Sequence, residues 1–272
     1  MHYLAVLGNP IVHSRSPEIH QNFARQFGIR LDYQKVLVPH DGLGHALKTL
    51  QDQGALGCNI TVPFKSDAAT RCDQVTEEAQ ELGVVNTLVF QSNGQILGHN
   101  TDGKGLIMDL LEHQRVTLAN KRILLLGIGG AGRGIVPALL SQGPATLDIW
   151  NRTSAAATDY ALAMKGAVSA PSKDTFLEAY DLVLNATAAG LSGATPDLPG
   201  RVIGTDTFCY DLSYGPRPTP FLAWASSQGT NHLSDGFGML VAQAAFAFEI
   251  WFGVRPDVRR ALSELKTSSK IS

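Results

Sequence analysis

Short apolar runs alternate with amphipathic segments along the first hundred residues of the chain. Runs of this length predict strands, and apolar residues at helical spacing predict the segments between them. The predicted strands are residues 3–7, 32–38 and 57–62, and the predicted helices are 17–27, 40–53 and 76–82. Residues 86–90 and 95–98 flank a Ser-Asn-Gly turn and predict a hairpin. Strands that alternate with helices indicate an α/β fold.

The pattern becomes sharper after residue 121. Residues 122–126 are a continuous apolar run, as expected for a strand that is buried on both faces of a parallel sheet. A glycine-rich loop follows this strand, and we expect a helix from there through Leu140. Further strands are predicted at 146–150, 181–185, 201–205 and 207–212. A long apolar helix from about 236 to 253 is expected to pack back on the first region, which would make that domain discontinuous.

The composition narrows the function classes. A length of 272 residues suits one large domain or two smaller ones, and 44% apolar residues are enough for a packed core. A net charge of −2 argues against a general nucleic-acid binder or a protein that binds anionic membranes. Gln243 and Glu249 interrupt the most apolar late stretch, so we expect no membrane span there.

The cysteines and the first residues indicate a cytoplasmic protein. Cys58, Cys72 and Cys209 form no C-x-x-C pair, so neither a disulfide framework nor a metal site is expected. Small buried side chains are the simplest interpretation of all three. The N-terminal run lacks the basic segment of a secretory signal and meets Gly-Asn-Pro almost at once, which is typical of a strand and a turn.

The loop Gly127-Ile128-Gly129-Gly130-Ala131-Gly132 fits the G-x-G-x-x-G pattern between a predicted buried strand and a predicted helix. In that context the first glycine allows a tight turn and the second lets the backbone approach a pyrophosphate. The third lets helix and strand pack closely. The start of the following helix would offer N–H groups to the phosphates. The loop therefore predicts a dinucleotide site rather than an ordinary glycine-rich turn.

Asn151, Arg152 and Thr153 stand at the end of the next predicted strand, where NAD sites usually carry an acid for the ribose 2′-hydroxyl. A guanidinium can pair with a 2′-phosphate and stack on adenine, and Thr153 can add a hydroxyl donor. This chemistry favours NADP. The alternative is a surface arginine that caps a loop.

Several polar residues stand where strands of the first region are expected to end. Ser14 and Ser16 follow the first strand, Thr61 ends the third, and Asn86 begins the hairpin. Ser16 with Pro17 is also a good helix start, and each of these residues has an ordinary structural interpretation. Together with a dinucleotide site, they predict a cleft that recognises hydroxyl groups.

Lys65 is the best candidate for proton transfer. It follows the strand, the proline and Phe64 of the run NITVPFK, where an aromatic ring can shield the amine. When a carbonyl is reduced its oxygen must gain a proton, and a positioned acid–base group typically contributes about 10²–10⁴-fold in rate. Asp102, in the polar run GHNTDG, is a candidate partner that would hold the amine charged and oriented. The alternatives are a surface lysine and an aspartate that caps a turn; His13 and His99 are rival proton carriers.

These residues, taken together, match a known family: the chain resembles the shikimate dehydrogenase family along nearly its whole length. The matching stretches are GNPIVHSRSPEIH, GCNITVPFK, GVVNTL, GHNTDGKG, GIGGAGRG, NRT, NAT, YDLSYGPRPTPF and DGFGMLVAQAAFAFEIWFG. The resemblance implies NADP-dependent reduction of 3-dehydroshikimate to shikimate in aromatic amino-acid biosynthesis. It implies an α/β substrate domain of residues 1–102 and 237–272, completed by the C-terminal helix, and a Rossmann-like NADP-binding domain of residues 103–236. A cleft separates the two domains in the family, and the protein is expected to be a monomer or a homodimer.

The resemblance also implies roles for individual residues. The family's catalytic lysine and aspartate fall on Lys65 and Asp102. Its substrate contacts fall on Ser14, Ser16, Thr61, Lys65, Asn86, Asp102, Tyr214 and Gln243. Its cofactor contacts fall on Glu77, Gly127, Ile128, Gly129, Gly130, Ala131, Asn151, Arg152, Thr153, Leu212 and Gly236. Gln243 as a satisfied buried amide and Tyr214 as an ordinary loop aromatic are the alternatives.

One departure from the family pattern bears on the cofactor. The family often carries a second basic residue three positions beyond the threonine of NRT, and here that position is Ala156. The 2′-phosphate would then depend mainly on Arg152. Two alternative functions therefore remain: a quinate/shikimate dehydrogenase with relaxed use of NAD and NADP, and a catalytically silent NADP(H)-sensing homologue.

Overall fold

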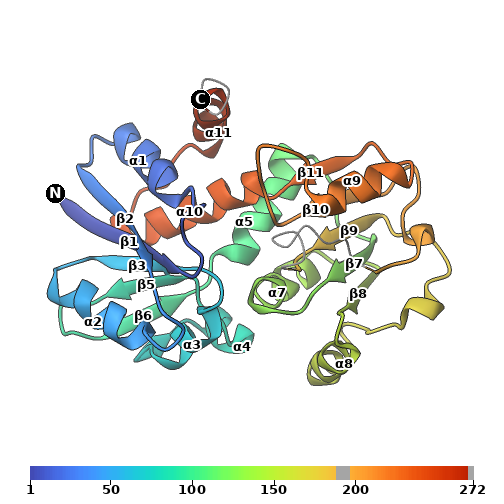
Figure 1. Ribbon diagram of the computed structural model, residues 1–272, viewed down its shortest axis with the longest axis horizontal. Helices are drawn as coiled ribbons and strands as arrows, with labels where there is room; N and C mark the ends of the chain where they lie inside the picture. Colours follow the sequence, from blue (N-terminus) through green and yellow to red (C-terminus); the bar gives the residue numbers. More distant parts are fainter. Residues whose placement is uncertain (188–196, 269–272) are drawn as a thin grey trace. The chain divides into compact units, whose positions relative to one another are not determined.

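The computed structural model describes residues 1–187 and 197–268 of the chain (Figure 1). Its contacts divide the chain into two units. Unit 1 comprises Met1–Gly105 and Leu240–Ser272, and unit 2 comprises Leu106–Met239. The chain crosses between the units inside two helices, α5 (Asp102–Met108) and α10 (Phe237–Phe252), a few residues after the boundaries that the sequence suggests.

Unit 1 is built on a six-stranded mixed sheet in the order β2-β1-β3-β5-β6-β4. Its strands are β1 His2–Gly8, β2 Leu31–Leu37, β3 Gly57–Ile60, β4 Gln74–Val75, β5 Thr87–Phe90 and β6 Ile96–His99. Strand β1 pairs in parallel with β2 and β3, whereas β5 pairs antiparallel with β3 and β6. The β5–β6 pair is the predicted hairpin.

Both faces of this sheet are buried. Successive residues of β1 point to opposite sides, and each side packs into its own cluster. Leu4 and Val6 pack on the side of α10, in a cluster with Tyr33 and Trp251. Ala5 and Leu7 join the larger cluster on the other side. The unit 1 helices are α1 Ser16–Gln26, α2 Leu43–Asp52, α3 Lys65–Thr70, α4 Glu77–Leu82 and α11 Val258–Ser268.

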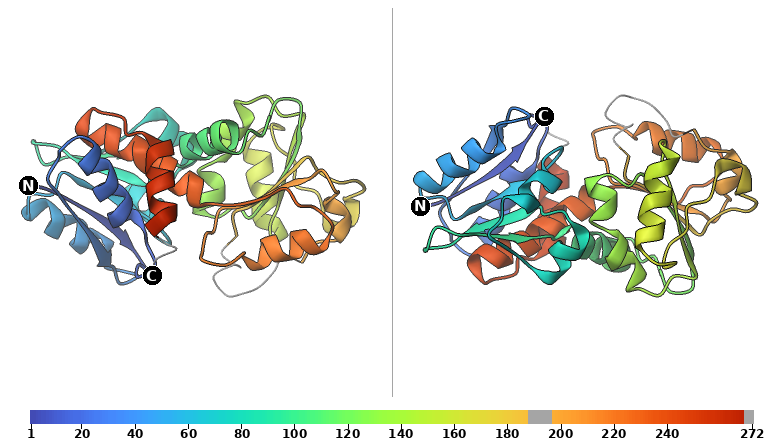
Figure 2. Two further views of the ribbon diagram at one scale, coloured as in Figure 1. Left: turned by 90° about the horizontal axis from the view of Figure 1, so that it is seen from above. Right: turned by 90° about the horizontal axis from the view of Figure 1, so that it is seen from below.

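Two local features of unit 1 follow from the sequence. Thr76 caps α4 as its spacing predicts, since its hydroxyl accepts a hydrogen bond from the Ala79 N–H at 3.4 Å. Helix α11 lies beside α1 (Figure 2), and the Asn22 amide donates to the Glu264 carboxylate at 2.7 Å. The C-terminal segment therefore completes unit 1.

Unit 2 is built on a five-stranded parallel sheet in the order β11-β10-β9-β7-β8. Its strands are β7 Arg122–Leu126, β8 Thr146–Trp150, β9 Leu182–Asn185, β10 Phe208–Asp211 and β11 Leu233–Asp235. The strand order reverses beside β7, which is where parallel sheets of this kind bind ligands at the carboxyl ends of their strands.

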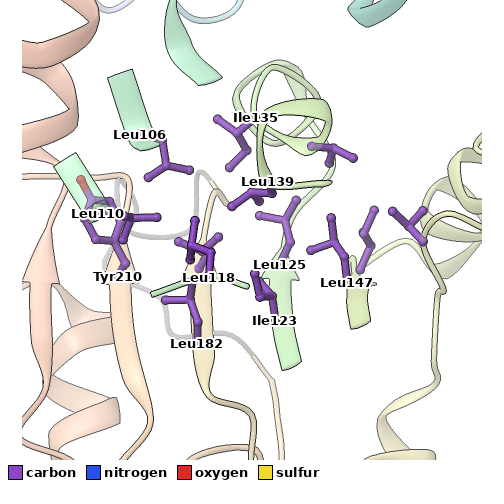
Figure 3. Packing of buried hydrophobic residues seen from close by; sticks show 14 of the residues in the cluster. Leu106, Leu110, Leu118, Ile123, Leu125, Ile135, Leu139, Leu147, Leu182 and Tyr210 are labelled. Carbon is purple, nitrogen blue, oxygen red and sulfur yellow. The ribbon is translucent and has the colours of Figure 1, made fainter. Parts of the chain in front are cut away.

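Both faces of the unit 2 sheet are buried, as the continuous apolar run of β7 predicts. Ile123 and Leu125 pack on one side with α7 and Tyr210 (Figure 3). Leu124 and Leu126 pack on the other side with residues of α9. The helices of the unit are α6 Gly130–Arg133, α7 Val136–Leu140, α8 Ser154–Ala163 and α9 Pro220–Ser227, with 3₁₀ turns at Lys173–Thr175 and Gly200–Val202 and a π-helical turn at Asp109–His113.

Two predicted elements of unit 2 are wrong. The helix expected through Leu140 is two short helices that break after Arg133, because Pro137 lacks an N–H and its ring would clash with the Arg133 carbonyl in a continuous helix. The strand expected at 201–205 is a 3₁₀ turn with Val202 buried; the Val202 N–H bonds the Pro199 carbonyl at 3.2 Å instead of a neighbouring strand.

The three cysteines are free thiols, and Cys58 and Cys209 are buried. Across residues 1–187 and 197–268, no helix is long and apolar enough to cross a membrane.

Candidate active site

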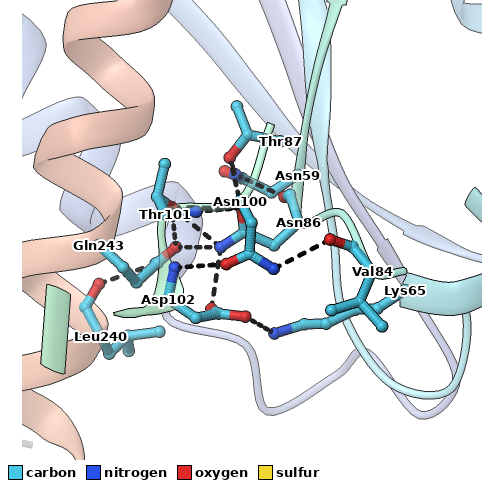
Figure 4. Close-up of polar contacts among 10 residues, drawn as sticks. All are labelled: Asn59, Lys65, Val84, Asn86, Thr87, Asn100, Thr101, Asp102, Leu240 and Gln243. Carbon is cyan, nitrogen blue, oxygen red and sulfur yellow. Dashed lines mark hydrogen bonds and ion pairs between the residues drawn. The ribbon is translucent and has the colours of Figure 1, made fainter. Parts of the chain in front are cut away.

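Lys65 and Asp102 form an ion pair in unit 1. The Lys65 Nζ lies 2.5 Å from the Asp102 Oδ2, and the side chains are 13% and 6% exposed (Figure 4). Two charges this far from water attract each other through a lower effective dielectric than an exposed pair does. Lys65 is therefore not a solvated surface charge.

The local fold explains how the pair is assembled. Strand β3 ends at Ile60, and the turn that follows leads directly into α3, whose first residue is Lys65. The Val85 N–H donates to the Lys65 carbonyl at 3.1 Å, which ties the start of α3 to the segment before Asn86. Asp102 begins α5, where its backbone N–H donates to the Asn100 side chain at 2.9 Å. Phe64 is buried in the core beneath the turn.

Asn86 connects this pair to the rest of the network. Its NH₂ group donates to the Asp102 Oδ1 at 2.9 Å and reaches the Gln243 Oε1 at 3.2 Å. Its Oδ1 accepts from the Thr101 backbone N–H at 3.0 Å. Asp102 thus receives one donor on each carboxylate oxygen, from Asn86 and from Lys65.

Gln243 enters the same network from α10, as a polar residue on an apolar helix. Its Nε2 donates to the Leu240 carbonyl at 2.9 Å, so its Oε1 faces Asn86 and Thr101. The backbones of α5 and α10 approach closely at this point: a Cβ placed on Gly105 would lie 2.5 Å from the Gln243 Cβ. The glycine allows Gln243, distant in sequence, to reach Asn86.

Ser14 lies in the segment that connects β1 to α1, Ser16 is the first residue of α1, and Thr61 directly follows β3. The Ser14 hydroxyl donates to the Ser16 hydroxyl at 3.2 Å. The Thr61 methyl packs against Gly8, at the end of β1, so closely that a Cβ there would be 2.4 Å away. Two serine hydroxyls and a threonine hydroxyl in these positions suit an oxygen-rich small molecule.

The glycine loop of unit 2 has the conformation that its motif requires. Gly127 has φ +91°, a left-handed value that favours glycine. A Cβ on Gly132 would lie 2.1 Å from the Gly127 carbonyl, so helix and strand pack too closely for a side chain. A Cβ on Gly129 would meet nothing within 4 Å, so the loop borders open space at this residue, while Gly130 and Ala131 are half-buried.

The Asn151 side chain joins the glycine loop to the end of β8. Its Oδ1 accepts from the Ile128 N–H at 3.3 Å, and its Nδ2 donates to the Thr153 carbonyl at 3.0 Å. Arg152 is exposed beside it, and the Thr153 side chain does not cap α8. Ala156 is partly buried against the core of unit 2.

The remaining predicted residues fall in separate places. Gly236 packs against Leu212, since a Cβ there would lie 2.2 Å from the Leu212 carbonyl oxygen. Tyr214 follows β10, and its ring centroid is 6.1 Å from that of Phe237. Glu77 is exposed in the first turn of α4, in unit 1.

His99 is a poor proton donor at neutral pH. Burial of the ring, and then the nearby Lys104 ammonium, lower the pKa of His99 below its usual value, while Glu78 opposes them. This direction disfavours the imidazolium, which is the form that would donate a proton.

Three family models match the chain. The shikimate dehydrogenase substrate binding domain matches residues 6–88, shikimate / quinate 5-dehydrogenase matches 109–195, and the shikimate 5′-dehydrogenase C-terminal domain matches 236–266. The shikimate dehydrogenase (NADP(+)) of Vibrio campbellii is 45% identical over 264 residues, which cover 96% of this chain and 95% of that protein. This chain belongs to the NADP-dependent shikimate dehydrogenase family.

Solved structures agree with this assignment. An Ael1 enzyme from Pseudomonas putida has a TM-score of 0.90 and 39% identity, covering 97% of this chain and 98% of that one. A Thermus thermophilus shikimate 5-dehydrogenase in complex with NADP(H) and shikimate has a TM-score of 0.83 and 34% identity, covering 96% and 100%. The predicted two-domain α/β fold, oxidoreductase class and NADP dependence are thereby confirmed for this family member.

The structure also brings Thr101 and Thr87 into the network, neither of which the sequence singled out. Thr101 contributes its N–H to Asn86 and its hydroxyl to Gln243. Asn59 and Thr87 lie behind Asn86 and are buried. For Thr101, the sequence signal is its place in the polar run NTD at 100–102, between Asn100 and Asp102.

Proposed function

We propose that this chain catalyses the reversible NADP-dependent reduction of 3-dehydroshikimate to shikimate, with Lys65 and Asp102 as the catalytic pair. The observation that carries the assignment of the pair is the shielded 2.5 Å contact between the Lys65 Nζ and the Asp102 Oδ2. An acid–base group needs a fixed position at the reacting oxygen, and this ion pair supplies it.

The chemistry of carbonyl reduction determines which atom receives the proton. As hydride reaches C3 of 3-dehydroshikimate, negative charge develops on the C3 oxygen, and the Lys65 ammonium donates a proton there. Asp102 holds the amine in place and balances its charge before the transfer. In the oxidation of shikimate, the neutral amine takes the proton from the C3 hydroxyl.

The other polar groups of unit 1 would orient the substrate. The hydroxyls of Ser14, Ser16 and Thr61 match a carboxylate as donors. Asn86 and Gln243 match the ring hydroxyls, which both donate and accept. Tyr214 is proposed as a further donor to the substrate.

NADP supplies or accepts the hydride when it is bound. The residues of unit 2 fit this group: the Gly127–Ala131 loop borders open space at Gly129, and Asn151 fixes the loop against the turn that carries Arg152. Arg152 would pair with the 2′-phosphate, with Thr153 as a hydroxyl donor. Leu212, Gly236 and Glu77 are proposed as further contacts.

We assign most of the substrate contacts to unit 1 and most of the cofactor contacts to unit 2; Tyr214 of unit 2 and Glu77 of unit 1 are the two exceptions. The proposed partners are therefore two small molecules. A cytoplasmic location is proposed from the free thiols and the composition.

A four-way comparison of initial rates tests the function and its cofactor together. Shikimate and quinate are each oxidised with NADP⁺ and with NAD⁺, in wild-type protein and in Arg152→Gln. We expect the wild type to be fastest with shikimate and NADP⁺. Arg152→Gln should lose about 10–100-fold in kcat/KM for NADP⁺ and change little with NAD⁺, since one charge-assisted phosphate contact is removed.

Lys173→Gln is the matched control, because Lys173 pairs with Asp197 on the exposed surface of the same unit at 2.6 Å. Lys173→Gln should leave kcat/KM for both NADP⁺ and NAD⁺ unchanged. Dominant activity with quinate or NAD⁺ would instead indicate the broader dehydrogenase, with Ala156 as its explanation. No activity with any pair would favour the NADP(H)-sensing homologue.

A further inference from the structure

The orientation of the Asn86 side chain decides what Asp102 faces. A carboxamide has nearly the same shape when it is rotated by half a turn, but its two ends have opposite chemistry. With its NH₂ group toward the Asp102 Oδ1, at 2.9 Å, Asn86 stabilises and aims the carboxylate. With its oxygen there, it would repel the carboxylate and move it away from Lys65.

Three donors lie at the Asn86 oxygen, on the opposite side. The Thr101 backbone N–H, at 3.0 Å, can only donate. The Thr87 hydroxyl is the nearest of the three, with its Oγ1 2.9 Å from the Asn86 Oδ1. The Thr101 hydroxyl is the farthest, at 3.2 Å, and its hydrogen is shared with the Gln243 Oε1 at 3.3 Å. Thr87 is fully buried, so no water replaces its contact.

A hydroxyl can donate or accept, and the groups behind Thr87 determine which it does. The Asn59 Nδ2 donates to the Thr87 Oγ1 at 3.1 Å and to the Asn86 backbone carbonyl at 3.1 Å. The Asn59 Oδ1 accepts from the Tyr33 hydroxyl at 2.6 Å. Because Asn59 must donate to Thr87, the single Thr87 hydrogen is directed to Asn86.

Tyr33 remains a donor under all ordinary conditions. It is 3% exposed, and burial raises the pKa of its hydroxyl well above the usual value. The hydrogen bonds therefore run in one direction, from Tyr33 through Asn59 and Thr87 to Asn86.

We propose that Thr87 is a positioning residue for the reaction, whose hydroxyl holds the Asn86 carboxamide with its NH₂ group toward Asp102. The inference deepens the proposed function, since it rests on the catalytic role of the pair formed by Lys65 and Asp102. Thr87 touches neither substrate nor cofactor in this account, and acts through Asn86.

The test compares Thr87→Val with Thr87→Ser. Valine keeps the β-branched shape that suits β5 and removes the hydroxyl; serine keeps the hydroxyl. We expect Thr87→Val to lower kcat for shikimate oxidation about tenfold or more with a smaller change in KM, because the catalytic pair loses its alignment. Thr87→Ser should recover most of the wild-type kcat.

Thr230→Val is the control for the loss of a buried threonine hydroxyl. Thr230 is also fully buried, and its Oγ1 donates to the Thr207 carbonyl at 2.7 Å in unit 2. It should lower the melting temperature as Thr87→Val does, but leave kcat nearly unchanged. A wild-type kcat in Thr87→Val would overturn the inference, and so would an equal loss in Thr87→Ser, which would indicate packing.

A crystal structure of Thr87→Val gives a readout that does not depend on activity. The inference predicts that the Asp102 carboxylate moves, with longer contacts to the Asn86 side chain and to the Lys65 Nζ than the 2.9 and 2.5 Å of the wild type. An unchanged network would contradict it. If the wild-type protein does not oxidise shikimate, the proposed function fails, whereas this structural arm still decides the role of Thr87.

Discussion

Lys65→Met is expected to lower kcat for shikimate oxidation by about 10²–10⁴-fold, the usual contribution of a positioned acid–base group. Methionine keeps the apolar part of the side chain and removes the amine. KM for shikimate should change much less, because the amine acts mainly in the transition state. Steady-state kinetics with saturating NADP⁺ separates the two effects.

Lys104→Met is the matched control for removing a lysine from an ion pair. The Lys104 Nζ lies 2.8 Å from the Glu78 carboxylate, but the Lys104 side chain is 54% exposed. Its replacement should leave kcat within about twofold, as expected for a surface pair. An unchanged kcat in Lys65→Met would remove Lys65 from the mechanism.

Asp102→Asn is expected to have the second largest effect. The carboxylate accepts one donor on each oxygen, from the Asn86 Nδ2 at 2.9 Å and from the Lys65 Nζ at 2.5 Å. An asparagine offers only one oxygen, so its NH₂ group must face one of these two donors. We expect kcat to fall about 10²-fold or more, because the amine loses its position and its counter-charge.

The same change at an exposed carboxylate provides the comparison. Asp67 accepts from the Arg71 guanidinium at 3.0 Å and is 39% exposed. Asp67→Asn should keep kcat within about twofold of the wild type, and the melting temperature should change little. If Asp102→Asn kept the wild-type kcat, Asp102 would have no part in positioning Lys65.

The parts of the fold that the sequence predicts well are those where one local rule dominates. The apolar run 123–126, with a glycine-rich loop directly after it, predicts a buried strand, and Thr76 followed by acids marks the start of α4. Pro137 shows the opposite case, because a proline inside an apolar helical pattern splits it into α6 and α7.

Other elements depend on contacts that no local pattern contains. Residues 201–205 have the composition of a strand, but β11, a short polar segment, takes the edge position beside β10 instead. Strand propensity is weak evidence when pairing partners decide the outcome.

The site residues also divide into those that the sequence predicts and those that depend on contacts it does not show. The candidate residues were identified from their position at strand ends and from family resemblance, and the pairing of Lys65 with Asp102 follows from the need for a counter-charge. The orientation of Asn86 could not be predicted, because it depends on the directions in which Thr87 and Asn59 donate, and the sequence shows neither contact. Only the three-dimensional contacts show that their polar atoms form one directed series.

The central claim is that this chain transfers hydride to C3 of 3-dehydroshikimate. The most direct measurement is to incubate 3-dehydroshikimate with NADPH that carries deuterium at both C4 positions, and to analyse the product by NMR and mass spectrometry. The account predicts shikimate with deuterium at C3 and at no other carbon. A product without deuterium, deuterium at another position, or no reduction at all would contradict it.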